Sequence, residues 1–223
     1  MANKLEEMPL FPLNTVLFPF ASVQLHVFEE RYREMVRNCL DMDLPFGVVL
    51  IRQGDEVGGV HADPYMVGTA ARILRVRTYD DGRMDIHVKG ERRFRIRSLD
   101  ESKPYLVGMV EPVVEHDMEE SEEAVELLAR ARAEFEVYIQ RLFSSPDFAV
   151  QVVFPPDPVA LSFTIANLLQ IENLEKQKLL ETTDTLERVQ DLLPILEQQM
   201  IDDPHPQLHK LSSQELSEWM FPN

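Results

Sequence analysis

The clearest structural signal in the chain is MVGTAARILRVRTYDDGRMDIHVKGERRFRI, residues 66–96. Its first part, as far as Tyr79, is rich in apolar and β-branched residues. The pair Asp81-Gly82 follows, and it suits a tight turn because glycine tolerates positive φ. After the turn, apolar and polar residues alternate, first over Met84–Lys89 and then over Arg93–Arg97. A period of two is typical of antiparallel strands with one buried face, so the stretch predicts a long β-hairpin.

The β pattern continues on both sides of this hairpin. Val23–Val27 shows the same alternation, and Tyr105–Val110 is expected to form another strand that ends before Pro112. Glu29–Leu40 breaks the pattern, because its apolar residues have helical spacing: Tyr32, Met35, Val36 and Cys39. We therefore expect one short helix within a sheet or barrel.

The second half of the chain changes to helical spacing. Asp157 is a candidate N-cap for the apolar run Val159–Ile171, because a proline occupies the first helical position after it. Asp184 and Glu187 form a capping-box pattern at the start of a later helix, in which Pro194 is expected to cause a kink. The helix expected before these two has an apolar stripe of Val125, Leu128, Phe135, Ile139 and Leu142.

These periods predict an α+β fold made of three parts. Residues 1–115 form a β-rich region, residues 116–202 form a helical region packed on it, and residues 203–223 form a tail. A second capping pattern in the tail predicts a short helix around Trp219. That helix either docks on the body or is offered to a partner.

The charge of the chain is unevenly distributed. The formal net charge is -17, but Arg72–Lys103 holds 10 Lys or Arg and 6 Asp or Glu, whereas Glu111–Asp203 holds 6 and 21. Such an acidic surface repels nucleic acid and anionic lipid unless a separate basic face is presented. No apolar run is long enough for a membrane helix, so no membrane partner is expected.

The cysteine content and the amino terminus indicate the compartment. Cys39 is the only cysteine, so no internal disulfide can form, and we expect a passive packed thiol at this position. The first residues are charged and proline-rich, which argues against a secretory signal peptide. A cytoplasmic setting is therefore expected.

Four segments together resemble the amino-terminal substrate-binding domain of Lon-type proteases. They are PLFPLNTVLFP at 9–19, LHVFEERYREMV at 25–36, the pair GTAARILRV at 68–76 and GERRFRI at 90–96, and a helical stretch at 157–196 that contains EKQKLLE. They occur in the order found in that family, and the resemblance spans residues 9–200. It implies a PUA-like β pseudo-barrel of about six strands with one inserted helix, followed by a helical bundle.

The resemblance also implies a function. In full-length Lon enzymes this region is thought to hold unfolded or tagged polypeptide for an ATPase and a serine–lysine protease. The chain has eight glycines and no Gly-x-x-x-x-Gly-Lys phosphate loop, and it has no room for the protease part after Met200. We therefore expect a free-standing, non-catalytic module that binds unfolded or partly folded polypeptide, an adaptor to a chaperone or protease acting in trans, with no cofactor. The name of a protease could still be transferred to this chain by sequence similarity alone.

A peptide-binding groove would combine an exposed strand edge with apolar pockets. The candidate walls are the seam between the two regions and the aromatic residues Phe18, Phe20, Phe28 and Tyr32. The alternative is that these aromatic residues belong to the core, because aromatic side chains at strand or helix spacing normally pack inward.

RNA binding is the alternative function. PUA-like folds include RNA-binding domains, and Arg93, Arg95 and Arg97, with Arg72, Arg75, Arg77 and Lys89, could form a basic face. Recognition of single-stranded RNA usually adds stacking aromatic residues, and only two tyrosines lie close in sequence. The other interpretation is that the arginines are outward residues of half-buried strands that neutralise the acidic helical region.

No metal or catalytic site is expected. His61 with Asp63, and His205 with His209, are pairs, whereas zinc needs three or four converging ligands. Carboxylates are so abundant that neighbouring pairs arise by chance, so we nominate no general acid or base and no hydrolase. The oligomeric state does not follow from the sequence.

Overall fold

The computed structural model describes residues 5–56, 58, 62–116, 118, 121–142 and 153–202. These residues form two compact units. The first contains the chain up to Val114 together with Glu172–Glu181, and the second contains Glu115–Ile171 and the chain from Thr182 onward. The predicted tail, with Trp219, lies outside the described residues.

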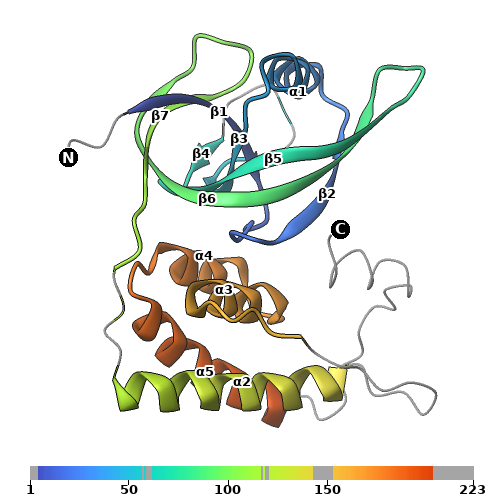
Figure 1. Ribbon diagram of the computed structural model, residues 1–223. Coiled ribbons are helices and arrows are strands. Elements are labelled where there is room, and N and C mark those ends of the chain that lie inside the picture. Colours follow the sequence, from blue (N-terminus) through green and yellow to red (C-terminus); the bar gives the residue numbers. More distant parts are fainter. Residues whose placement is uncertain are drawn as a thin grey trace. The chain divides into compact units, whose positions relative to one another are not determined.

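The first unit is built around a closed ring of five strands (Figure 1). They are β1 (Glu6–Leu13), β3 (Phe46–Gln53), β5 (Val67–Thr78), β6 (Met84–Asp100) and β7 (Val107–Pro112). Neighbours pair antiparallel in the order β1-β7-β6-β5-β3, and a parallel pairing of β1 with β3 closes the ring. The mixed α+β fold expected from the sequence is confirmed.

The β5–β6 hairpin is longer than the ring needs, and Figure 1 shows its turn end reaching beyond β3. Tyr79 N–H donates to the Arg83 carbonyl across the turn at 2.9 Å. Gly82 supplies the positive φ, 82°, which the Asp-Gly pair predicted. In its first half β6 pairs with β2 (Ser22–Val27) on the edge opposite β5, and in its second half it pairs with β7. The short strand β4 (Asp63–Pro64) pairs with β3.

Two apolar clusters form the core of this unit. One lies inside the ring and is centred on Leu10 and Phe94. A Cβ at Gly47 would lie 2.5 Å from Cζ of Phe94, so that position has no room for a larger side chain. In the other cluster, helix α1 (Glu30–Met42) buries the predicted stripe against the inner face of β2 and β6. The inserted helix is therefore confirmed, and its apolar spacing is what attaches it to the sheet.

Helix α4 (Asn173–Glu181) belongs to the first unit, although its sequence lies far from the strands. Gln177 Nε2 donates to the Val67 carbonyl at 3.0 Å, and Asn173 Nδ2 donates to the Asn14 carbonyl at 2.6 Å. The apolar spacing predicted a helical run over Val159–Ile171 but no separate helix at the position of α4. The division at residue 115 and the packing of a helical region on the β-rich region stay predictions.

The second unit contains α2 (Glu122–Leu142), α3 (Pro158–Leu168) and α5 (Thr185–Asp202). The predicted caps are confirmed, because Asp157 accepts from Ala160 N–H at 2.7 Å and Asp184 accepts from Leu186 N–H at 2.8 Å. The predicted stripe of α2 is wrong at Val125, which is exposed. The buried side of α2 includes Ala124 and Ala131 instead.

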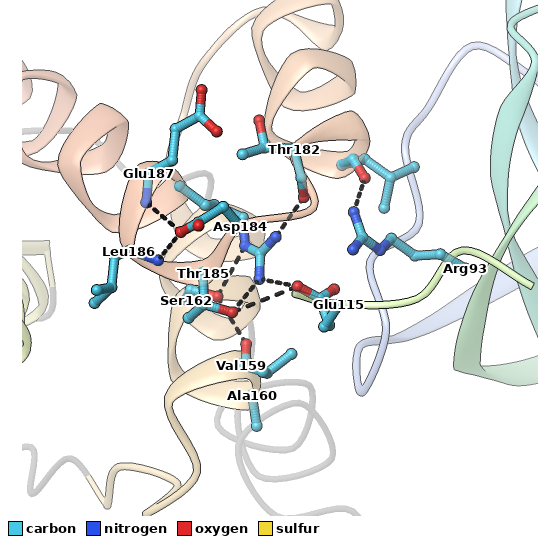
Figure 2. Close-up of polar contacts among 12 residues, drawn as sticks. Arg93, Glu115, Val159, Ala160, Ser162, Thr182, Asp184, Thr185, Leu186 and Glu187 are labelled. Carbon is cyan, nitrogen blue, oxygen red and sulfur yellow. Dashed lines mark hydrogen bonds and ion pairs between the residues drawn. The ribbon is translucent and has the colours of Figure 1, made fainter. Parts of the chain in front are cut away.

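A buried guanidinium holds the helices of this unit together. Arg188 lies on the buried side of α5 and is fully enclosed. It donates to Ser162 on α3 at 2.9 Å, to the Thr182 carbonyl at 2.6 Å and to Glu115 at 3.0 Å. Figure 2 shows these partners converging from different parts of the unit. Burial lowers the pKa of Arg188, and the neighbouring Glu115 carboxylate opposes that shift.

Candidate functional site

The four predicted aromatic residues of the peptide site divide into two pairs. Phe18 is fully buried, and Tyr32 is buried with its ring stacked 4.2 Å from that of Phe11. Phe20 and Phe28 are each 46% exposed. Only the second pair offers surface to a ligand in this conformation, while the role of all four in binding stays a prediction.

Phe20 is held outward by the backbone. Its N–H donates to the Gly90 carbonyl at 2.8 Å, and Gly90 N–H donates to the Ala21 carbonyl at the same distance. The φ angle of Phe20 is 69°, a left-handed value that costs a side-chain-bearing residue roughly 1–2 kcal/mol. A bulky aromatic residue that is both strained and exposed is unusual, and such strain is concentrated at functional sites.

The outer half of β5 is exposed on both of its faces. All residues from Leu74 to Thr78 are exposed, including Leu74 at 45% and Val76 at 37%. One edge of β5 pairs with β6 along its whole length, whereas β3 pairs with the other edge only at Thr69–Ala71. Among the described residues, no strand pairs with that edge beyond Ala71. The outer half of β5 is therefore an uncovered strand edge that carries two large apolar side chains.

The strand register assigns each of these residues to a face. Val76 pairs with Ile86, which is buried under α1, so Val76 lies on the inner face of the sheet. Arg77 pairs with Asp85, and Arg75 pairs with His87, on the outer face. The register of β5 with β6 shifts between Ile73 and Arg75, which makes Leu74 a bulge residue. Apolar and basic side chains thus point to opposite faces of one exposed strand.

A polar and aromatic cluster occupies the outer face beside Arg77. His26 Nδ1 lies 2.6 Å from Asp85 Oδ1, and the Tyr79 hydroxyl donates to the other oxygen of Asp85. These two hydrogen bonds hold the pKa of Asp85 below its ordinary value, and the bond to Asp85 raises the pKa of Tyr79. The Phe28 ring stacks 6.0 Å from the His26 ring, and the Arg77 guanidinium lies 5.1 Å from the Tyr79 ring centre. The cluster extends the candidate surface from β5 across β6 to β2.

Arg75 and Arg77 differ from most arginines of the strands in having no carboxylate partner. Arg72 pairs with Glu91 and Asp43, and Arg92 pairs with Glu6. For Arg75 and Arg77, the described part of the chain provides no ion pair. Arg75 and Arg77 thus place two exposed guanidinium groups on one strand face, and Arg77 also interacts electrostatically with Asp85 opposite it on β6.

The three arginines of the RNA alternative do not form one exposed row. Arg93 is 3% exposed and donates to the Leu180 carbonyl of α4 at 2.5 Å. Arg97 pairs with Glu111 of β7, and Arg95 is half-buried. The geometry gives Arg93 and Arg97 structural partners and half-buries Arg95, so we propose no RNA site on them.

The remaining candidates concern metal binding and catalysis. Asp63 pairs with Arg52, while its predicted companion His61, like His205 and His209, lies outside the described residues. No group of three or more potential ligands is found in the described ranges. Burial raises the pKa of Cys39 to about 11, so this thiol is a poor nucleophile.

Sequence reasoning missed the main features of this surface. The alternation at residues 73–77 predicts a strand with one polar face, but it contains no signal that the strand edge lacks a neighbour. The cluster of Phe28, His26 and Tyr79 joins segments about fifty residues apart in the sequence, and only the register of β2 with β6 brings them together. No described helix is long and apolar enough to cross a membrane.

The fold and this surface define an α+β protein whose β-barrel unit presents an unpaired strand edge. Residues 7–198 match the family described as the ATP-dependent protease La (LON) substrate-binding domain, and the chain belongs to that family.

Relatives and solved structures agree with this assignment. The chain is 29% identical to Lon protease 2 of Myxococcus xanthus over 191 residues, which are 85% of the chain and 23% of that protein. It is 28% identical to the Lon protease of Escherichia coli K12, covering 87% of the chain and 25% of that protein. The chain therefore spans about a quarter of the length of these relatives.

Among solved structures, the Lon N-terminal domain protein from Xanthomonas campestris is similar with a TM-score of 0.58 and 29% identity, covering 85% of this chain and 98% of that one. The N-terminal domain of the Mycobacterium avium complex Lon protease has a TM-score of 0.63 at 21% identity, covering 86% and 98%, and supports the fold alone.

Proposed function

We propose that this protein binds unfolded or partly folded polypeptide without cleaving it, and that the exposed outer half of β5 is the principal contact. The observation that carries the proposal is the run Leu74–Thr78, an unpaired strand edge with apolar side chains in solvent. Membership of a substrate-binding family supports the kind of ligand. A fold alone is a weak warrant for function, so the strand edge is the part that experiments must test.

Strand addition explains why such a surface suits polypeptide. An unpaired edge offers backbone N–H and C=O groups to any extended segment, whatever its sequence, and only unfolded chains have such segments available. Leu74 and Val76 add apolar contact, and Phe20 and Phe28 are further exposed contacts on the same unit. Phe18 and Tyr32 support the corner and helix that carry them.

We further propose an adaptor role, in which the bound polypeptide is passed to a chaperone or protease acting in trans, in the cytoplasm. The matched region is the substrate-binding part of much longer proteases, and Cys39 is too protected to serve as a nucleophile. Delivery of a bound client then requires a second protein that supplies ATP hydrolysis and cleavage.

Binding of an unfolded client tests the polypeptide-binding function directly. A reduced and alkylated protein carrying a fluorescent label should bind saturably, and its native form should not. The variant Leu74→Thr with Val76→Thr places β-branched residues at both strand positions and removes apolar contact, so binding should weaken about tenfold. Leu5→Thr with Val114→Thr is the matched control, because these residues are equally apolar and exposed elsewhere on the unit.

The adaptor role needs a separate assay. The protein with bound client is added to an ATP-dependent protease from the same cells, and the rate of client degradation is compared with that of client alone. Acceleration that the β5 variant loses and the control variant keeps supports the role. An unchanged degradation rate contradicts it, even where binding is normal. Absence of saturable client binding at high micromolar concentration rules out the binding function itself.

A further inference from the structure

Two properties of the β5 edge restrict the sequence that it can accept. On the outer face, Arg75 and Arg77 stand two residues apart without a carboxylate partner among the described residues. On the opposite face, Val76 continues the apolar row formed by Ile86 and Leu25 of the neighbouring strands. An added strand would place alternate side chains beside these two rows.

We propose that the outer half of β5 selects extended polypeptide segments in which acidic and apolar residues alternate. This inference rests on the proposed polypeptide-binding function and specifies which class of polypeptide the same surface binds. Acidic side chains of the added strand lie beside Arg75 and Arg77, and the intervening apolar side chains lie beside Val76 and Leu74.

The charge of the edge favours this occupant over a second copy of the same strand. Two β5 strands paired antiparallel with Val76 opposite Val76 would place arginines opposite arginines, and like charges directly across a strand pair are destabilising. The cations therefore protect the edge from self-association while they attract carboxylates. Arg72, Arg92 and Arg97 of this unit have carboxylate partners and Arg95 is half-buried, whereas Arg75 and Arg77 are exposed without an ion pair among the described residues.

The cluster beside Arg77 limits how the acidic residues bind. Asp85 already accepts hydrogen bonds from His26 and Tyr79, and Arg77 lies over the Tyr79 ring. The carboxylate of Asp85 is therefore engaged on its own sheet, and a cation–π contact with the Tyr79 ring restrains the Arg77 guanidinium. A ligand carboxylate beside Arg77 meets a positioned cation, whereas a ligand lysine meets two positive charges.

Two labelled peptides provide the test, one alternating Glu with Val and one alternating Lys with Val, each measured by fluorescence anisotropy at low and high salt. The Glu–Val peptide should bind at least about tenfold more tightly, and the difference should shrink as salt rises. Arg75→Glu with Arg77→Glu should invert the preference, so that the Lys–Val peptide becomes the better ligand. Inversion is a result that simple unfolding of the variant cannot give.

The matched control carries the same charge change elsewhere: Arg52→Glu with Arg97→Glu, on β3 and on the other half of β6. This control should leave the preference for the Glu–Val peptide intact. Equal loss in the control would mean that net charge alone acts, and the proposal would be overturned. Wild-type protein that binds both peptides equally, or prefers Lys–Val, also overturns it.

Backbone methylation tests the strand-addition geometry. In an extended peptide, the N–H groups of alternate residues point to the same edge, so methylating the nitrogens of all Glu residues blocks one edge and methylating those of all Val residues blocks the other. One of these two peptides should lose binding and the other should keep it. If both bind like the parent peptide, main-chain pairing is excluded. Saturable binding of unfolded protein with no peptide preference removes this inference and leaves the proposed function standing, whereas loss of all binding removes both.

Discussion

Phe20 shows at the scale of one residue how backbone strain and exposure coincide. Its left-handed φ suits glycine, and hydrogen bonds to Gly90 on β6 fix that conformation. Phe20→Gly and Phe20→Ala both remove the ring, so their difference reports the strain alone. We expect the glycine variant to be more stable by about 1 kcal/mol, the reverse of the usual order, because alanine retains a Cβ at positive φ. Urea unfolding of the two variants measures this difference, and a more stable alanine variant contradicts it.

Cys39 is a second residue whose behaviour follows from its surroundings. Burial raises the pKa of its thiol to about 11, so almost none is ionised at pH 8. We expect no alkylation by iodoacetamide in the folded protein and rapid alkylation in denaturant, followed by mass spectrometry. Rapid modification of the native protein would show that α1 opens, because Cys39 lies on the buried face of that helix, in the core.

At the scale of elements, Arg188 joins α5 to α3 and to the segments that contain Glu115 and Thr182. Arg188→Ala removes a fully enclosed guanidinium that donates to Glu115, to Ser162 and to the Thr182 carbonyl, and should destabilise the second unit by about 3–5 kcal/mol. Arg130→Ala on the same unit removes an exposed guanidinium paired with Glu134 and Glu197, and should cost less than about 1 kcal/mol. Thermal unfolding of both variants compares them. Similar costs would mean that the buried network contributes little.

The elements themselves differ in how far the sequence predicted them. The hairpin, β2, α1 and the caps of α3 and α5 were predictable, because each has a local period or a local capping residue. Helix α4 was not, because its attachment depends on bonds from Gln177 and Asn173 to backbone carbonyls far away in the sequence. The candidate surface could not be predicted for the same reason. Whether a strand edge is paired depends on the positions of all the other strands, and the alternation at 73–77 does not contain that information.

At the scale of the whole molecule, the account assigns binding to this chain and cleavage to another protein. Incubation with unfolded casein, ATP and Mg²⁺ should give no fragments, as followed by gel electrophoresis and mass spectrometry. The physical reason is that the proposed contact is a docking edge and that burial protects the Cys39 thiol from acting as a nucleophile. Peptidase activity that co-elutes with the protein through two different columns would contradict this division of labour.

Hydrogen exchange with an unfolded client bound is the most direct test of the β5 edge. The account predicts that client slows exchange at backbone amides within Leu74–Thr78, because an added strand occupies the edge that no described strand pairs with. The variant Leu74→Thr with Val76→Thr should lose most of this protection together with the client. Saturated binding that leaves Leu74–Thr78 unprotected, or that protects only the free edge of β2, would contradict the account.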